Sequence, residues 1–208
     1  IILLAAGNKY YFLMSLVCRR WCYVLQAWRK RGGRELALQT PNDVYLQTLP
    51  LVHWAHVNGC PWDTDTSVAA AKYGVLEVIK YLFNYGCPTN KYMSQNAAAN
   101  GRLHVLKYLR SKRCNINGMA CILAASNGHF TVLKWLARNG YECSFYAIAG
   151  AAKNGHFTIL QWLFARGCQW NALTCSHAAS NGHLHILQWA RANGCAWDKS
   201  TCKYAAKY

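Results

Sequence analysis

The sequence predicts an all-α solenoid of about six helix–turn–helix repeats behind an N-terminal helical module. Three observations lead to this prediction. First, an Ala-Ala pair returns at a constant step of 27 residues, at Ala70-Ala71, Ala97-Ala98, Ala124-Ala125, Ala151-Ala152, Ala178-Ala179 and Ala205-Ala206. Second, a turn such as Asn127-Gly128 follows each of the first five pairs. Third, an amphipathic apolar segment follows each turn, and such a fixed period is typical of stacked repeats.

Residues 1–36 lie outside the repeat and predict a helix with an apolar stripe and a basic flank. Apolar residues recur there at steps of three or four, which is the helical period: Phe12, Leu13, Leu16, Val17, Trp21, Val24, Leu25 and Trp28. Gly32-Gly33 then ends the helix. Repeat arrays need a terminal cap, so a helix that covers the first repeat is one interpretation of this segment.

The run Leu16-Val17-Cys18-Arg19-Arg20-Trp21 resembles the most recognisable part of the F-box, a short three-helix module. The resemblance covers about 30 residues and lacks the family's opening Leu-Pro. It implies docking on the small adaptor subunit of cullin-type ubiquitin ligases. By position, the adaptor-binding side chains would be those of Leu13, Leu16, Val17 and Trp21. One helix could both dock on the adaptor and cap the array.

Residues 37–208 hold the repeat, and each unit is expected to contain two short helices. In the first helix, the small Ala pair lets neighbouring helices approach closely. The second helix carries a recurring aromatic residue, at Trp54, Tyr81, Tyr108, Trp135, Trp162 and Trp189. A Gly usually ends it, and an Asp or Asn then suits the N-cap of the next helix: Asp63, Asn90, Asn117, Asn171 and Asp198. Arg113 replaces that Gly once, so we expect local irregularity there.

Across residues 47–206, the pattern Ala-Ala-x-x-Gly-His-Leu/Phe-x-Val/Ile-Leu-x-Trp/Tyr-Leu-x-x-x-Gly-Cys resembles the ankyrin repeat. The units are about six residues shorter than the usual 33, and the Thr-Pro-Leu-His opening is missing. The resemblance therefore implies a short-unit array with loops in place of hairpins. Because the chain ends at Tyr208 where a turn Gly would follow, we expect the array to continue.

The same resemblance implies a protein-recognition scaffold whose partner groove is lined by the two residues after each Ala pair. The expected groove residues are Lys72, Tyr73, Asn100, Ser126, Asn127, Lys153, Asn154, Ser180 and Asn181. Arrays of this kind joined to an F-box-like start resemble proteins that large DNA viruses of protists encode in multiple copies.

The composition points to acidic partners and away from catalysis. The chain has 23 Lys and Arg against 7 Asp and Glu, a net charge of +16, which attracts anionic partners. No catalytic triad, paired carboxylates or phosphate loop appears, so we expect neither an enzyme nor a cofactor. His129, His156 and His183 lie one repeat apart, too far to share a metal ion, and we expect each to form a hydrogen bond that fixes its turn.

The eleven Cys fall mostly into two columns at the repeat period, and neighbouring members are too far apart for disulfides. We therefore expect free thiols in a reducing compartment, the cytoplasm or the nucleus. No apolar run is long enough to span a membrane, and a monomer is expected.

The function that best fits these observations is a substrate receptor linking a target protein to a cullin-type ubiquitin ligase. One alternative is a structural or anchoring ankyrin protein, including one associated with a viral particle. The other is a basic array that binds nucleic acid, for which only the net charge argues.

Overall fold

The structure, a computed structural model, describes residues 46–57 and 62–205. In these ranges the chain forms twelve α-helices and no strand, which confirms the predicted all-α repeat fold. Residues 1–36 lie outside the described part. The helical module predicted there, with Leu13, Leu16, Val17 and Trp21, therefore stays a prediction.

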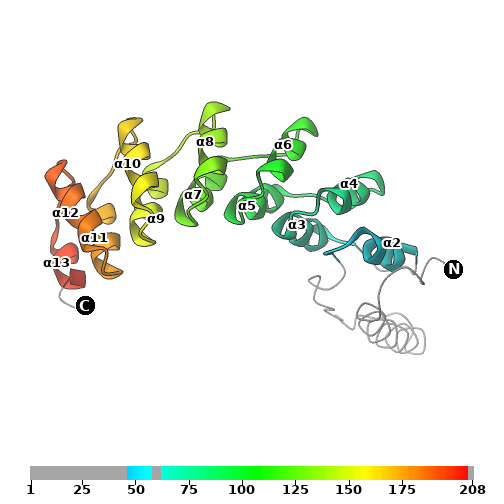
Figure 1. The fold of residues 1–208 in the computed structure, drawn as a ribbon, viewed down its shortest axis with the longest axis horizontal. Coiled ribbons are helices and arrows are strands. Elements are labelled where there is room, and N and C mark those ends of the chain that lie inside the picture. Colours follow the sequence, from blue (N-terminus) through cyan, green and yellow to red (C-terminus); the bar gives the residue numbers. More distant parts are fainter. Residues whose placement is uncertain (1–45, 58–61, 206–208) are drawn as a thin grey trace. The chain divides into compact units, whose positions relative to one another are not determined.

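Each unit contributes two helices, as Figure 1 shows. The first helices of the units are α3 (Thr64–Tyr73), α5 (Lys91–Ala99), α7 (Gly118–Ser126), α9 (Phe145–Lys153), α11 (Ala172–Ser180) and α13 (Lys199–Ala205). The second helices are α2 (Leu49–Val57), α4 (Leu76–Asn84), α6 (Leu103–Ser111), α8 (Phe130–Arg138), α10 (Phe157–Ala165) and α12 (Leu184–Ala192). None of these helices is long and apolar enough to cross a membrane.

Consecutive first helices pack against one another along the array, from α3 to α13. Their Ala pairs make this close packing possible, and both members of the pair Ala124-Ala125 are fully buried. Between α7 and α9 there is no room for a side chain, since a Cβ on Gly150 would collide with the hydroxyl of Ser126. Small residues at this face therefore set the spacing of the units.

The second helices supply the larger apolar side chains of the core. In α8, for example, Val132, Leu133 and Leu136 are fully buried, and each such side chain contributes about 1.5–3 kcal/mol to folding. The recurring aromatic residues join neighbouring second helices edge to face: the ring centroids of Phe130 and Trp162 lie 5.5 Å apart at an interplanar angle of 81°. The aromatic repeat therefore helps to hold successive units together.

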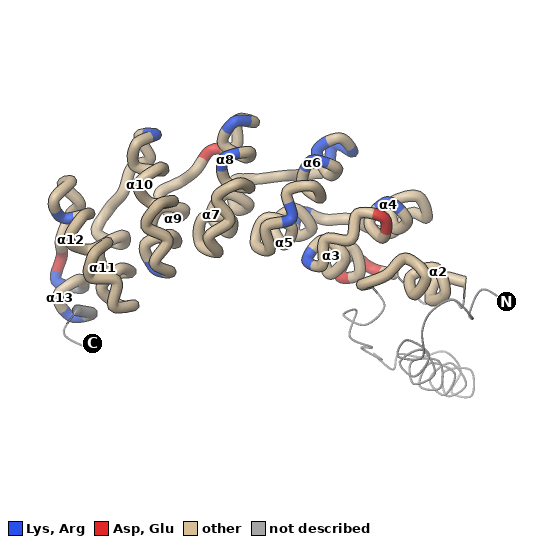
Figure 2. The backbone as a smooth tube through the Cα atoms, viewed as in Figure 1, with Lys and Arg blue, Asp and Glu red and all other residues tan. Residues whose placement is uncertain are grey.

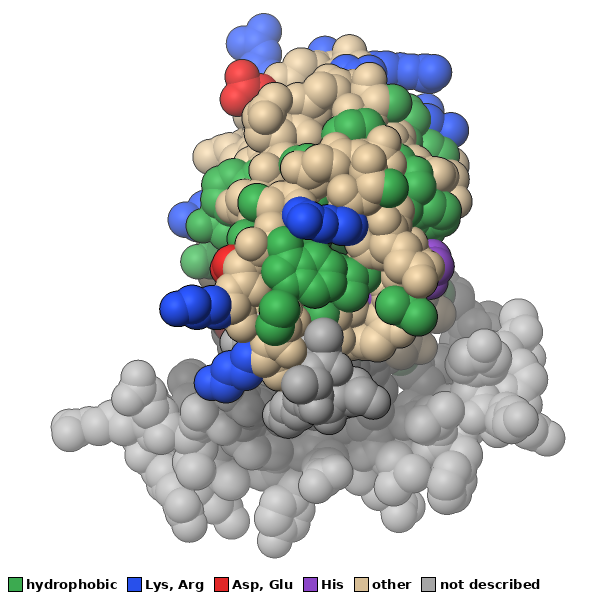
Figure 3. Space-filling model, turned by 90° about the vertical axis from the view of Figure 1, so that its left-hand side faces the viewer, with side chains coloured by type: hydrophobic (Ala, Val, Ile, Leu, Met, Phe, Trp, Pro, Cys, Tyr) green, Lys and Arg blue, Asp and Glu red, His purple; other side chains and the backbone are tan. Residues whose placement is uncertain are grey.

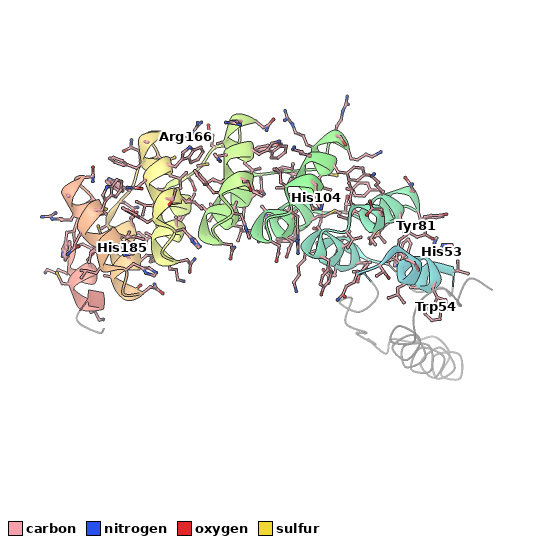
Figure 4. All side chains as sticks on the ribbon, viewed as in Figure 1. His53, Trp54, Tyr81, His104, Arg166 and His185 are labelled. Atoms are coloured by element: carbon pink, nitrogen blue, oxygen red, sulfur yellow. The ribbon has the colours of Figure 1, made fainter. Side chains whose placement is uncertain are left out.

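In the first described units, a polar contact adds to this aromatic packing. The Tyr81 hydroxyl lies 2.9 Å from Nδ1 of His53 and 3.0 Å from Nδ1 of His56. His53 and Tyr81 are labelled in Figure 4. These hydrogen bonds join α2 to α4.

The predicted N-caps are largely confirmed. Side-chain oxygens of Asp63, Asn90, Asn171 and Asp198 accept hydrogen bonds from backbone N–H groups in the first turn of the helix that follows. Asn117 occupies the same position but does not cap with its side chain. Its Oδ1 instead accepts a hydrogen bond of 3.4 Å from Nε2 of Gln95 in the preceding unit.

The local irregularity expected at Arg113 is confined to the backbone of this residue, which alone among the described non-Gly residues has a positive φ, while the path of the turn is the usual one. Arg113 adopts the left-handed conformation at φ 57°, where Gly86 has φ 73° at the equivalent turn. Its N–H donates to the carbonyl of Arg110 at 3.0 Å, as Gly86 donates to Phe83 at 3.2 Å. The packed units on both sides fix the path of the chain, and Arg113 accepts the strained backbone that this path requires.

Candidate functional site

The predicted groove residues lie at the C-terminal ends of the first helices and in the turns that follow. Lys72, Asn127, Lys153, Asn154 and Asn181 are exposed, and Tyr73, Asn100, Ser126 and Ser180 are half-buried. Because consecutive first helices pack side by side, equivalent residues of neighbouring units are brought next to one another. We call this set of nine residues the groove edge.

The Asn side chains of the groove edge are held in place by the fold. Nδ2 of Asn127 donates to the carbonyl of Leu123 at 2.9 Å, which satisfies a carbonyl at the end of its own helix. Asn154 donates to the carbonyl of Gly150 in its own helix at 3.3 Å and also reaches the preceding unit, where it donates to the carbonyl of Ser126 at 2.8 Å. Fixed side chains lose little conformational entropy when a partner binds, so this edge is preorganised.

The three His residues that follow the turn Gly connect neighbouring units. Nε2 of His129 lies 2.9 Å from the carbonyl oxygen of Ala99, and His156 and His183 make the same contact with Ser126 and Lys153 at 3.0 and 3.1 Å. A carbonyl oxygen only accepts, so Nε2 carries the hydrogen. The sequence-based prediction of a bond that fixes the turn therefore needs a correction: the bond crosses to the preceding unit.

The same bond forms at one of the two described turns that lack the His. Arg102 stands at that position, and its Nε donates to the carbonyl of Lys72 at 3.1 Å. His104, labelled in Figure 4, adds a bond from Nε2 to the carbonyl of Gly74. Sequence reasoning missed this role because a single Arg at a turn is usually a solvated side chain.

The turn Gly and the His of the next unit fit against each other. Gly128 adopts φ 79°, and a Cβ placed on it would lie 2.8 Å from Cε1 of His156. The position therefore requires Gly twice, for its backbone conformation and for the space that the ring occupies. The carbonyl acceptors of these bonds belong to groove-edge residues or their neighbours, so the His column also holds the groove edge in register.

The eight cysteines in the described part are free thiols, as the sequence predicted: Cys87, Cys114, Cys121, Cys143, Cys168, Cys175, Cys195 and Cys202. In the same part, no three His, Cys, Asp or Glu side chains are placed to hold a metal ion.

Two pairs of thiols interact in a way that was not foreseen from the sequence, because each pair joins a first helix to the loop that leads to the next first helix. A hydrogen bond between the Cys121 and Cys143 thiols raises the pKa of Cys121 and lowers that of Cys143. Cys175 and Cys195 form a second such pair. The spacing within either column gives no sign of these pairs, since Cys143 belongs to neither column and Cys175 and Cys195 belong to different ones.

A cavity of about 500 Å³ opens beside Cys143, at the opposite ends of the units from the groove edge. The loops after α8 and α10 line it, with Tyr141, Phe145 and Arg166 among the contributing side chains. Sequence reasoning missed this cavity, because it forms between loops of successive units.

Comparison with known families gives a match over residues 66–147 to ankyrin repeats (3 copies). No curated protein matches the chain. The matched residues run from α3 into α9 and so include three of the inter-unit interfaces described above. Ankyrin repeats form non-enzymatic scaffolds that bind proteins. The helix pairs and this match together support ankyrin repeats over residues 66–147, and ankyrin repeats indicate a protein–protein interaction module.

Proposed function

We propose that the protein is a substrate receptor of a cullin-type ubiquitin ligase. In this proposal, Leu13, Leu16, Val17 and Trp21 bind the adaptor subunit, and the array holds the target protein. The observation that carries the proposal is the run Val17-Cys18-Arg19-Arg20-Trp21 directly upstream of a protein-interaction array. The array performs no chemistry, because other subunits of the ligase transfer the ubiquitin.

The groove edge is the proposed target site. It offers fixed Asn amides, half-buried Tyr73 and the two cations Lys72 and Lys153. Such groups suit a polar epitope with acidic character. The net charge of +16 would speed the encounter with that partner.

The proposal extends to origin and compartment. The F-box-like start joined to short ankyrin units resembles the multi-copy proteins of large DNA viruses, so we propose a viral protein. It would act as a monomer in the cytoplasm or nucleus of the host. The free thiols of the described part support a reducing compartment.

Affinity purification of the full-length protein tests the adaptor contact. The double variant Val17→Asp, Trp21→Ala should lose the adaptor subunit, which mass spectrometry detects in the wild-type sample. The matched control is Lys72→Gln, Lys153→Gln, which changes the groove edge and should keep the adaptor while losing target proteins. Adaptor in none of the three samples, with helicity intact, would reject the ligase receptor in favour of an anchoring scaffold.

A further inference from the structure

The second helices end in a row of arginines that the groove edge does not include. Arg110, Arg138 and Arg191 lie in the last turns of α6, α8 and α12, and Arg166 directly follows α10. We call these four residues the arginine edge. All four are exposed. Figure 2 shows Lys and Arg at these helix ends, and Figure 3 shows basic side chains projecting from the end of the array that faces the viewer.

Almost no negative charge balances this edge. Between Glu77 and Asp198 the sequence contains a single acidic residue, Glu142. A cation at the C-terminal end of a helix is favoured by the helix dipole. The dipole explains why cations stand there, but it does not explain why carboxylates are missing around them.

Aromatic rings contact three of the four guanidinium groups. The Arg166 guanidinium lies 5.0 Å from the centroid of the Trp162 ring, and those of Arg110 and Arg191 each lie 5.9 Å from the centroids of Trp135 and Trp197, respectively. A guanidinium restrained against a ring keeps the N–H donors along its rim, which match the two oxygens of a carboxylate. These three groups are therefore preorganised for carboxylates.

The Trp162 ring at the middle of this edge is poorly placed to stack on a nucleic-acid base. Trp162 is contacted edge-on by Phe130 and is covered by Arg166. Binding of single-stranded nucleic acid relies on aromatic faces that are open to the bases. Polypeptide carboxylates therefore suit this edge better than a nucleic acid does.

The cavity of about 500 Å³ adds an apolar contact to the arginine edge. Arg166 lines it together with Tyr141, Phe145, Cys143 and Cys168, so the cation lies beside rings and thiols. An apolar side chain of a bound peptide would enter this cavity. Glu142 also lines it and opposes an acidic ligand.

The charge of the arginine edge and the cavity beside it together select the ligand. We propose that the arginine edge binds an acidic polypeptide segment, with carboxylates at the guanidinium groups and an apolar side chain in the cavity. The proposal rests on the array being a protein-interaction module and adds a second surface to it.

Fluorescence anisotropy with defined peptides tests the proposal on the full chain. The probe is a labelled peptide of about 15 residues that repeats Glu-Pro-Ala and has one central Leu. A peptide of the same composition with its Glu residues gathered at one end should bind at least about tenfold more weakly. Removal of the central Leu should also weaken binding, because the cavity would then stay empty.

Matched variants separate the arginine edge from the overall charge. The double variant Arg138→Gln, Arg166→Gln should bind the Glu-Pro-Ala peptide at least about tenfold more weakly. The double variant Lys72→Gln, Lys153→Gln loses the same charge but should change the affinity less than about twofold. Arg138→Lys, Arg166→Lys keeps the charge but should still lose affinity, because Lys lacks the planar pair of donors. Glu142→Gln should strengthen binding.

A second measurement locates the peptide. Cys143 is half-buried in the cavity lining, so the bound peptide should slow its alkylation by iodoacetamide. Equal weakening by the Arg→Gln and Lys→Gln pairs, no saturable peptide binding, or tighter binding of an oligothymidylate of equal charge would each overturn the proposal. Adaptor capture through residues 1–36 is measured separately, so failure of one proposal leaves the other standing.

Discussion

At the scale of single residues, the fold imposes on Arg113 a backbone conformation that L residues disfavour. Its left-handed backbone, φ 57°, costs an L residue about 1–2 kcal/mol. Arg113→Gly removes that strain but adds freedom to the unfolded chain. We expect the free energy of unfolding to rise by about 1 kcal/mol, measured by urea titration. Gly86→Ala is the matched control, because open space surrounds its missing Cβ. It should lower stability, and a gain there would contradict the argument.

Also at the scale of single residues, the Cys87 thiol should make the stability of the protein depend on pH. Burial and the nearby Asp63 carboxylate raise the pKa of this thiol from 9.0 to about 11. Between these values the unfolded chain has released the proton while the folded chain retains it. The stabilising effect is therefore complete below pH 9.0 and is lost as pH rises towards 11.

The variant Cys87→Ala should lack this dependence. The stability difference between wild type and variant is expected to shrink by about 1–2 kcal/mol across the window, because the lost packing is the same at every pH. Urea unfolding of both proteins at several pH values measures it, and all other titrating groups cancel. A difference that stays constant with pH would show that the thiol titrates normally.

At the scale of the elements, Gly128 and His156 couple one turn to the next unit. Gly128→Ala brings a Cβ into the His156 ring and should cost more than the backbone strain alone. In a His156→Ala background the ring is gone, so Gly128→Ala should lower the free energy of unfolding by about 1 kcal/mol less than it does in the wild type. A double-mutant cycle in urea measures this coupling. In the control Gly86→Ala the new Cβ meets no neighbour, so the loss in free energy of unfolding should be the same in both backgrounds. Additive effects of the Gly128 and His156 changes would refute the coupling.

The sequence predicts the elements better than it predicts the bonds between them. The period, the Ala pairs and the N-caps place the helices of the described part, because each signal acts within a few residues of itself. The direction of the His bonds is different, since the spacing of His129, His156 and His183 is compatible with contacts inside or across units. Arg102 and the Cys121–Cys143 contact depend on which unit lies alongside, and that information appears only after packing.

The candidate site divides in the same way. The nine groove-edge residues were named from the repeat, and the structure brings their equivalents side by side. The repeat did not predict the arginine edge, because Arg110, Arg138 and Arg166 stand at shifted positions in successive units. Only the shared geometry of the helix ends unites them.

At the scale of the whole molecule, the array should tolerate removal of one complete unit. Deletion of residues 129–155 joins Gly128 to His156, which keeps the Gly-His turn and lets α11 replace α9 against α7. Because each unit contacts mainly its neighbours, the shortened array should stay helical, with unfolding free energy and urea m-value both reduced by about one unit's share. Deletion of residues 129–141 removes half a unit and apposes unlike faces, so it should unfold the array by circular dichroism. Equal damage from both deletions would mean that stability depends on contacts beyond nearest neighbours.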